Sequence, residues 1–292
     1  MQPLALGIVV ISTVTHAYWN FLLKRSRGTT TFIALSKVAE VVCFAPVFVW
    51  FLARSNELTP RAVGMMAVGA ILVLFNYGAL ARAYAVGDLS FVYPISRASI
   101  LLFLPALGFL VFGERLNAIG WTSVACIIVG IALLQLPAFN VQAIRAATER
   151  LNGPSVGYSL TAAFFAAIYT VWDKRSIQTL TPFVYFYGYT LLVAAAYAVF
   201  MWRRTPRTEI VHVWTTHRSS VIQVGVFNTI TYLLVLFALR SGTSSYVIAL
   251  RQLSIVWGAL LGSFVLGETL APPKKLGIAT LVVGCVLVAF TR

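Results

Sequence analysis

Apolar residues occur along this chain in ten long runs that are separated by short polar stretches. A helix needs about 20 apolar residues to cross a bilayer, and the runs approach that length. The pattern therefore predicts an all-α integral membrane protein with ten transmembrane helices. The expected spans are residues 3–23, 31–53, 62–81, 89–112, 116–136, 155–172, 182–202, 219–239, 244–266 and 276–290.

The second half of the chain repeats the first half. The stretch Ser90 to Gln135 recurs at a shift of 154 positions, and the triplet Lys-Arg-Ser ends both the first and the sixth run. Because each copy holds five spans, the second copy must enter the membrane from the opposite face, which gives an inverted repeat. We expect two five-helix repeats, residues 1–136 and 155–292, joined by a linker at 137–154. The pairs include Arg97 with Arg251 and Glu114 with Glu268.

Composition supports a membrane location. The chain has 60% hydrophobic and 10% charged residues, with a mean hydropathy of +0.88. The net charge of +14 lies largely in loops and helix ends, so nucleic acid is not expected as a partner. The three cysteines are scattered inside apolar runs and match neither a disulfide framework nor a zinc site. No metal or cofactor is expected.

Several short motifs resemble the EamA-type members of the drug/metabolite transporter superfamily. They are HAYWNFLLKRS at the end of the first span, YPISR at the start of the fourth, and the Gly-Glu turns at 113–114 and 267–268. The resemblance covers essentially the whole chain. It implies transport of a small metabolite without ATP, a location in the bacterial inner membrane, and both termini in the cytoplasm. The distribution of Lys and Arg between loops would by itself place the termini outside.

Two arginines inside apolar spans are the first candidates for substrate binding, because buried charges are costly and are often functional. Arg97 and Arg251 occupy equivalent positions in the two repeats. If they face one cavity, their guanidiniums could hold a carboxylate, phosphonate or phosphate through bidentate hydrogen bonds. The alternative is that each arginine caps helix carbonyls or holds a loop.

An aromatic and polar face of the first span indicates a cavity wall, with a similar face on the sixth. Trp172 and Asp173 of the sixth span are expected to act as interfacial anchors. Polar residues inside the third and eighth spans are at least as compatible with helix–helix hydrogen bonds as with a cavity. These residues are Asn76, Tyr77, Asn228, Thr231 and Tyr232. The expected substrate-binding residues are His16, Trp19, Asn20, Arg97, Tyr169 and Arg251.

Three glutamates have separate interpretations. Glu40 lies three residues after Lys37 on one helix face, so the two charges are expected to neutralise each other; the alternative is that Glu40 takes part in proton coupling. Glu114 and Glu268 each follow a glycine at the turn into the next helix. They are expected to be structural and to accept hydrogen bonds from unpaired amides at a helix N-terminus.

We therefore expect a secondary-active transporter, in the direction of export, for a small polar metabolite such as an amino acid. The expected partners are a small-molecule substrate and the lipid bilayer. A transporter of an anionic phosphonate or phosphorylated metabolite and a lipid-carrier flippase are the alternatives. An enzyme is not expected, because the chain contains no G-x-S-x-G, H-E-x-x-H or Gly-rich phosphate motif.

Overall fold

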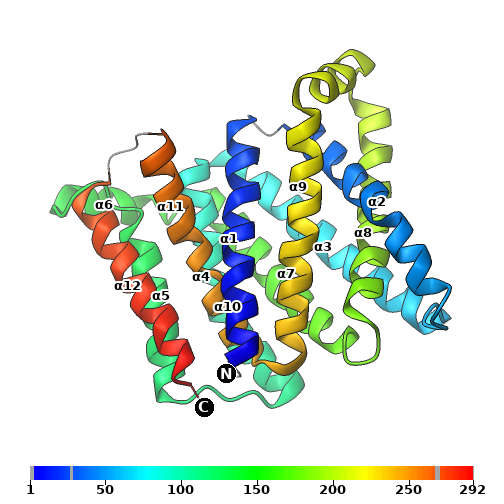
Figure 1. The fold of residues 1–292 in the computed structure, drawn as a ribbon. Coiled ribbons are helices and arrows are strands. Elements are labelled where there is room, and N and C mark those ends of the chain that lie inside the picture. Colours follow the sequence, from blue (N-terminus) through cyan, green and yellow to red (C-terminus); the bar gives the residue numbers. More distant parts are fainter. Residues whose placement is uncertain (1–2, 27–28, 267–269, 292) are drawn as a thin grey trace.

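The chain forms a bundle of helices in the computed structural model, which describes residues 3–26, 29–266 and 270–291 (Figure 1). Nine helices in these ranges are long and apolar enough to cross a membrane, and α5 is a shorter apolar helix. The predicted all-α membrane fold with ten spans is confirmed. The first half contains α1 (Pro3–Arg25), α2 (Thr30–Leu52), α3 (Pro60–Val86), α4 (Leu89–Phe112) and α5 (Ala118–Leu133).

The second half follows a short connecting helix, α6 (Val141–Arg150). Both ends of the chain lie at the same end of the bundle, as an even number of crossings requires (Figure 1). The ninth span is interrupted and consists of two helices, α10 and α11. The elements of this half are α7 (Pro154–Ser176), α8 (Pro182–Arg204), α9 (Arg207–Ser241), α10 (Ser244–Arg251), α11 (Leu253–Leu266) and α12 (Pro272–Ala289).

Two segments expected as connections contain helix. The linker at 137–154 holds α6, whose N-cap Asn140 accepts a hydrogen bond from the amide of Ala143 at 2.7 Å. The connection expected at 203–218, between the seventh and eighth spans, is mostly the first part of α9, which begins at Arg207. Pro206 occupies the N-cap position of α9, and no glycine or proline follows it before Gly225, so nothing interrupts the helix.

The two halves interdigitate. In the repeat, α1 corresponds to α7 and α3 corresponds to α9. Helix α1 packs against α9, and the corresponding pair, α7 with α3, packs in the same way. Helix α2 also packs against α8, and α5 against α12; in both pairs a helix contacts its own equivalent in the other half. Most of the extensive helix contacts therefore join one half to the other, as an inverted repeat arranged around a shared axis would require.

Helices α5 and α12 approach each other backbone to backbone at three glycines. A Cβ atom on Gly130 would lie 2.7 Å from the amide nitrogen of Leu281, and one on Gly277 would lie 2.7 Å from the carbonyl oxygen of Gly130. At the third glycine, Gly284 of α12, the Ser123 hydroxyl of α5 donates to the carbonyl oxygen at 2.7 Å. Small residues allow this close packing in lipid, where apolar burial alone does not favour helix association.

A largely buried ion pair joins the two halves at the end of the bundle that holds the termini. Glu114, after α4, accepts from Nζ of Lys174 on α7 at 2.5 Å, and from the backbone amide of Ser244, the first residue of α10, at 3.0 Å. Glu114 thus caps α10 rather than the next helix in sequence, because Asn117 already caps α5. Glu268, the repeat equivalent, lies outside the described residues.

We predict that Glu114→Gln lowers the free energy of unfolding by about 3 kcal/mol, because it leaves a buried ammonium without its anion. Thermal unfolding of the purified protein in detergent measures the effect. Glu149→Gln is the control, since Glu149 pairs with Arg145 on α6 with their side chains 65% and 80% exposed, and such pairs contribute little. Equal losses in both variants would contradict a special role for the Glu114 pair.

Candidate functional site

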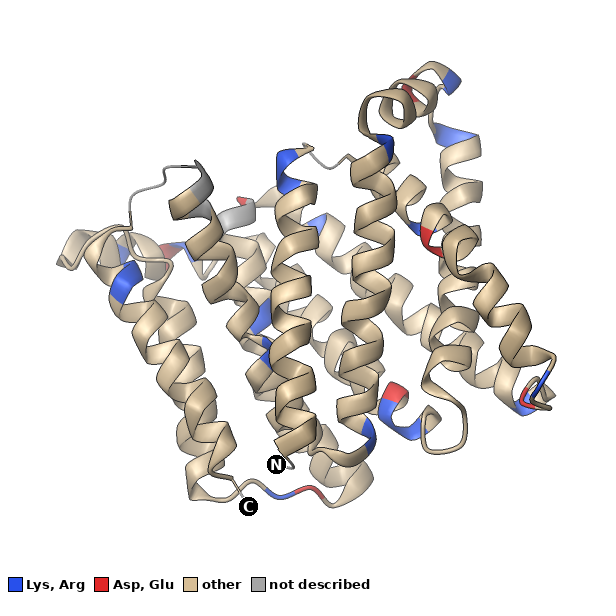
Figure 2. Ribbon diagram, in the orientation of Figure 1, with Lys and Arg blue, Asp and Glu red and all other residues tan. Residues whose placement is uncertain are grey.

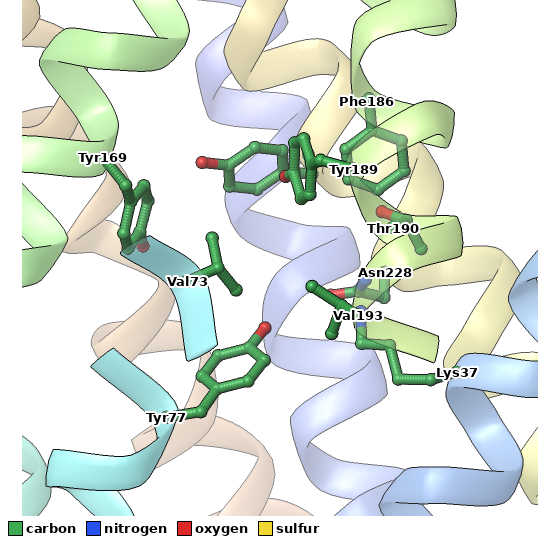
Figure 3. Close-up of a pocket in the computed structure, with 10 residues that line it drawn as sticks. Lys37, Val73, Tyr77, Tyr169, Phe186, Tyr189, Thr190, Val193 and Asn228 are labelled. Carbon is green, nitrogen blue, oxygen red and sulfur yellow. The ribbon is translucent and has the colours of Figure 1, made fainter. Parts of the chain in front are cut away.

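A small cavity of about 30 Å³ lies between helices of both halves (Figure 3). Figure 3 shows side chains from α2, α3, α7, α8 and α9 converging on it. A cavity needs roughly 10–15 Å³ to hold one water molecule, so in this conformation the space suits water rather than a metabolite. The residues that line it are Lys37, Val73, Tyr77, Tyr169, Phe186, Tyr189, Thr190, Val193, Asn228 and Tyr232.

Aromatic rings form much of the wall. Tyr232 of α9 stacks on Phe186 with ring centroids 5.4 Å apart, and its ring lies edge-on to Tyr189 at 6.4 Å. Tyr77 and Tyr169 approach from the opposite side (Figure 3). Of the residues predicted from the sequence to bind substrate, only Tyr169 lines the cavity directly. The polar insertions Tyr77, Asn228 and Tyr232 line it too.

The two repeat-related arginines approach this region from different halves. The guanidinium of Arg251, which is 8% exposed, lies 5.4 Å from the ring centroid of Tyr232, and that of Arg97 lies 5.1 Å from the ring of Tyr93. Both arginines act electrostatically on His16 and on Tyr169. Charged residues otherwise gather mostly at the helix ends (Figure 2). Arg97 and Arg251 thus both lie near His16 and Tyr169, and their contact with a substrate stays a prediction.

The interruption of the ninth span positions Arg251. Helix α10 ends at Arg251 and α11 begins after Gln252, so carbonyl groups inside the bundle lose helical partners. The Gln252 side-chain amide donates to the carbonyl oxygen of Ile248 at 3.0 Å, and Sγ of Cys285 lies 3.8 Å from that of Ala249. The Gln252 side chain thus serves the carbonyl of Ile248, whereas the carbonyl of Ala249 also accepts from the backbone amide of Gln252 at 3.1 Å. Local contacts of this kind allow broken helices at membrane depth. Such breaks often form transporter binding sites.

The expected face of α1 divides into separate roles. His16 is 2% exposed, and its Nδ1 is buried without a hydrogen-bond partner among the described residues. Its ring meets that of Trp19 edge-on at 4.9 Å, and Trp19 packs against a second apolar cluster that contains Leu22. The Asn20 side chain donates to the carbonyl oxygen of His16 at 2.8 Å within its own helix. Trp19 and Asn20 do not line the cavity.

Glu40 is 2% exposed and has a complete set of partners. It accepts from Nζ of Lys37 at 2.8 Å, from Nδ2 of Asn228 at 3.0 Å and from the hydroxyl of Thr229 at 2.9 Å. These contacts join α2 to α9, and Gly225 permits the close approach because a Cβ there would lie 2.8 Å from the carbonyl oxygen of Ser36. The pair borders the cavity through Lys37.

Asp173 was set aside as an interfacial anchor rather than a residue of the cavity wall, and the anchor role is wrong. It is fully buried and accepts hydrogen bonds from the hydroxyls of Tyr185 at 2.7 Å and Tyr232 at 2.5 Å. Its position four residues after Tyr169, on the same helix face, was the available signal. Trp172 is half-buried and joins α7 to α3, because its Nε1 donates to the carbonyl oxygen of Met65 at 3.0 Å.

Four of the five polar insertions form interhelical hydrogen bonds, which were one of their two expected roles; those of Asn228 to Glu40 and of Tyr232 to Asp173 are described above. The Asn76 side chain of α3 donates to the carbonyl oxygen of Ala162 on α7 at 2.7 Å. The Thr231 hydroxyl of α9 donates to that of Thr15 on α1 at 2.7 Å. Both bonds join the two halves of the chain.

A bundle of interleaved, inverted halves with a polar centre defines a membrane transporter. The model of the EamA-like transporter family matches residues 154–290. Spermidine export protein MdtI of Shigella flexneri is 32% identical over 104 residues, which are 36% of this chain and 89% of that protein. The protein of that name from Citrobacter koseri is 31% identical with the same coverage. The chain belongs to the EamA-like transporter family of the drug/metabolite transporter superfamily.

A solved structure shows the same fold over nearly the whole chain. This crystal structure of a protein superposes with a TM-score of 0.76 and 15% sequence identity, and the match covers 98% of this chain and 96% of that one. The likeness therefore extends to the first half, which lies outside the part matched by the family model.

We predict that Lys37→Met and Glu40→Gln each destabilise the protein by about 3 kcal/mol, because each leaves one buried charge unpaired. The double variant should recover most of this loss, since it removes both charges while the Gln carbonyl can still accept from Asn228 and Thr229. Thermal unfolding of the three variants gives the coupling free energy. Additive losses in the double variant would show that the pair makes no net interaction.

Proposed function

We propose that the protein is a secondary-active transporter that exports a small polar metabolite bearing a carboxylate, such as an amino acid, across a bacterial inner membrane. The observation that carries this proposal is the meeting of Arg97 and Arg251 at one region. Nε of Arg251 is buried without a hydrogen-bond partner among the described residues. Buried polar groups are normally hydrogen-bonded, so an unpaired donor beside a cavity favours an acceptor supplied by a ligand or by water.

The surrounding groups suit the rest of an amino acid. Tyr77, Tyr169, Tyr189 and Tyr232 present ring faces and hydroxyls around the cavity. Aromatic faces attract ammonium groups, and buried phenol hydroxyls can exchange hydrogen bonds with them. A zwitterion would thus place its carboxylate toward the arginines and its ammonium toward the tyrosines. The cavity must widen for this, as alternating access requires.

A phosphonate or phosphorylated metabolite is the second candidate. Lys37 is paired with Glu40, whereas Arg97 and Arg251 take part in none of the ion pairs between described residues, so the two guanidiniums give the centre an excess of positive charge even when Asp173 is ionised. A dianion would complement this charge better than a zwitterion. The same excess disfavours spermidine, which the names of the curated relatives specify for those proteins.

Counterflow in proteoliposomes tests the proposal. Vesicles containing the purified protein are loaded with one unlabelled compound, and entry of its radiolabelled form is measured for L-alanine, L-glutamate, a phosphonate, a sugar phosphate and spermidine. We expect exchange of at least one carboxylate compound and none of spermidine. Exchange of spermidine alone would overturn the proposal, and exchange of only the phosphorus compounds would favour the second candidate.

We predict that Arg97→Gln and Arg251→Gln each weaken binding of the transported compound by about 1.5 to 3 kcal/mol, because each removes a charged hydrogen bond. Arg97→Lys should also impair binding, since lysine lacks the planar fork. Substrate affinity and protein yield are measured together on the same variants. Unchanged affinity in well-folded Gln variants would mean that the arginines do not contact the substrate.

A further inference from the structure

Asp173 is a buried carboxylate that the proposed substrate contacts do not use. It lies near the end of α7 with no exposed surface, and none of the ion pairs between described residues includes it. Its direct partners are the hydroxyls of Tyr185 and Tyr232. Glu40, by contrast, has a lysine at 2.8 Å. A carboxylate inside a membrane without a paired cation is costly when ionised, and such groups often carry protons in transporters.

The groups around Asp173 come from several helices. On α8, Tyr185 donates to it and Tyr189 interacts with it electrostatically; on α9, Tyr232 donates to it; and on α10, Arg251 supplies the positive charge that acts on it. Tyr169 lies one turn earlier on α7, and Arg97 of α4 acts on Tyr169. Helix α3 presents a glycine, Gly69, whose Cβ would lie 2.6 Å from the Tyr185 hydroxyl.

Tyr232 connects Asp173 to the proposed binding region. Its hydroxyl donates to Asp173, its ring lies 5.4 Å from the guanidinium of Arg251, and it lines the cavity. We propose that Asp173 binds and releases the proton that couples transport to a proton gradient, and that Tyr232 and Arg251 link its protonation to the binding of the substrate. This inference rests on the proposed anion contact at Arg251.

The sign of the coupling follows from the charges. The guanidinium of Arg251 lies 5.4 Å from the ring of Tyr232, whose hydroxyl donates to Asp173, and a positive charge at that position favours a negative charge on the carboxyl group. An anionic group bound to Arg251 cancels much of that charge, so the neutral, protonated form of Asp173 becomes favoured. By linkage, a proton on Asp173 strengthens binding of the anion by the same factor. The substrate and one proton therefore cross together: the proton passes from water on one side to an Oδ of Asp173 and is released to water on the other. Export by this route is driven by the outward gradient of the substrate, and each exported molecule carries one proton out against the inward proton gradient.

Infrared difference spectroscopy on the purified protein tests the assignment without a substrate. A carboxylic acid C=O band should appear as the pH is lowered, should be lost in Asp173→Asn and should remain in Glu40→Gln, which is the matched buried control. Loss of the band in Glu40→Gln with retention in Asp173→Asn would assign the proton to Glu40 and overturn the proposal.

Two further variants test the link and do not depend on the stability of Asp173→Asn. In Arg251→Gln and in Tyr232→Phe, the Asp173 band should appear at a pH about one unit higher than in the wild type, because the charge or the hydrogen bond that favours the ionised form is lost. Arg145→Gln on exposed α6 should leave the titration unchanged. Unshifted titrations in both Arg251→Gln and Tyr232→Phe would overturn the link.

L-Alanine and inorganic phosphate serve as probes of the protein with an anion bound at Arg251. Either one, if it binds at Arg251, should shift the Asp173 titration of the wild type in the same direction as Arg251→Gln. In proteoliposomes with a trapped pH indicator, the transported probe should carry protons in the wild type but not in Asp173→Asn, which should keep exchange. A probe that is transported without protons by the wild type would overturn the coupling. If the Asp173 titration shifts in Arg251→Gln and Tyr232→Phe but neither probe shifts it in the wild type, the result would count against the proposed substrate class and not against the link.

Discussion

A bilayer interior offers no water to an unpaired peptide group, and this constraint shapes the molecule. It requires helices wherever the chain crosses the membrane, and it makes any break in a helix expensive unless side chains replace the lost hydrogen bonds. The described residues meet that requirement between α10 and α11, where Gln252 and Cys285 contact carbonyls of the preceding turn. The break can therefore exist, and it places Arg251 at a helix end inside the bundle.

The second organising feature is the difference between the surroundings of two buried carboxylates, Glu40 and Asp173. Glu40 is surrounded by a lysine, an asparagine and a threonine, so its charge is balanced locally and its contacts hold α2 against α9. Among the described residues, the hydrogen-bond donors to Asp173 are two phenol groups, and the guanidinium of Arg251 lies on the ring of Tyr232, one of the two. The first arrangement suits a fixed structural contact. The second leaves the balance of charge open to change by whatever binds at Arg251.

Much of the fold could be predicted from the sequence, because hydropathy alone marks spans. The fourth span, expected at 89–112, is α4 with the same limits. The internal repeat also marked Arg97 and Arg251 as equivalent positions, and both lie near His16 and Tyr169. Hydropathy identifies a span because most of its residues are apolar. It does not distinguish the residues that face lipid from those that are buried in the bundle.

The rotation of each helix could not be predicted for the same reason. In a soluble helix the polar face shows which side is buried, whereas here both sides are apolar and give no such signal. Trp19 was therefore expected at the cavity but packs elsewhere, and Asp173 was expected at an interface but is enclosed. The partners of Glu114 likewise come from the other half of the chain, so its neighbours in sequence did not reveal them.

The interleaving of the halves has a consequence for how the protein is made. Because α1 packs against α9 and α3 against α7, the helices that emerge first from the ribosome have few of their final partners until the last ones are inserted. The first five helices must wait in the lipid as a loose set, with Asn76 and Glu40 still lacking partners on α7 and α9. A chain that stops early would leave these polar groups without their partners inside the lipid, where an unpaired polar group is costly.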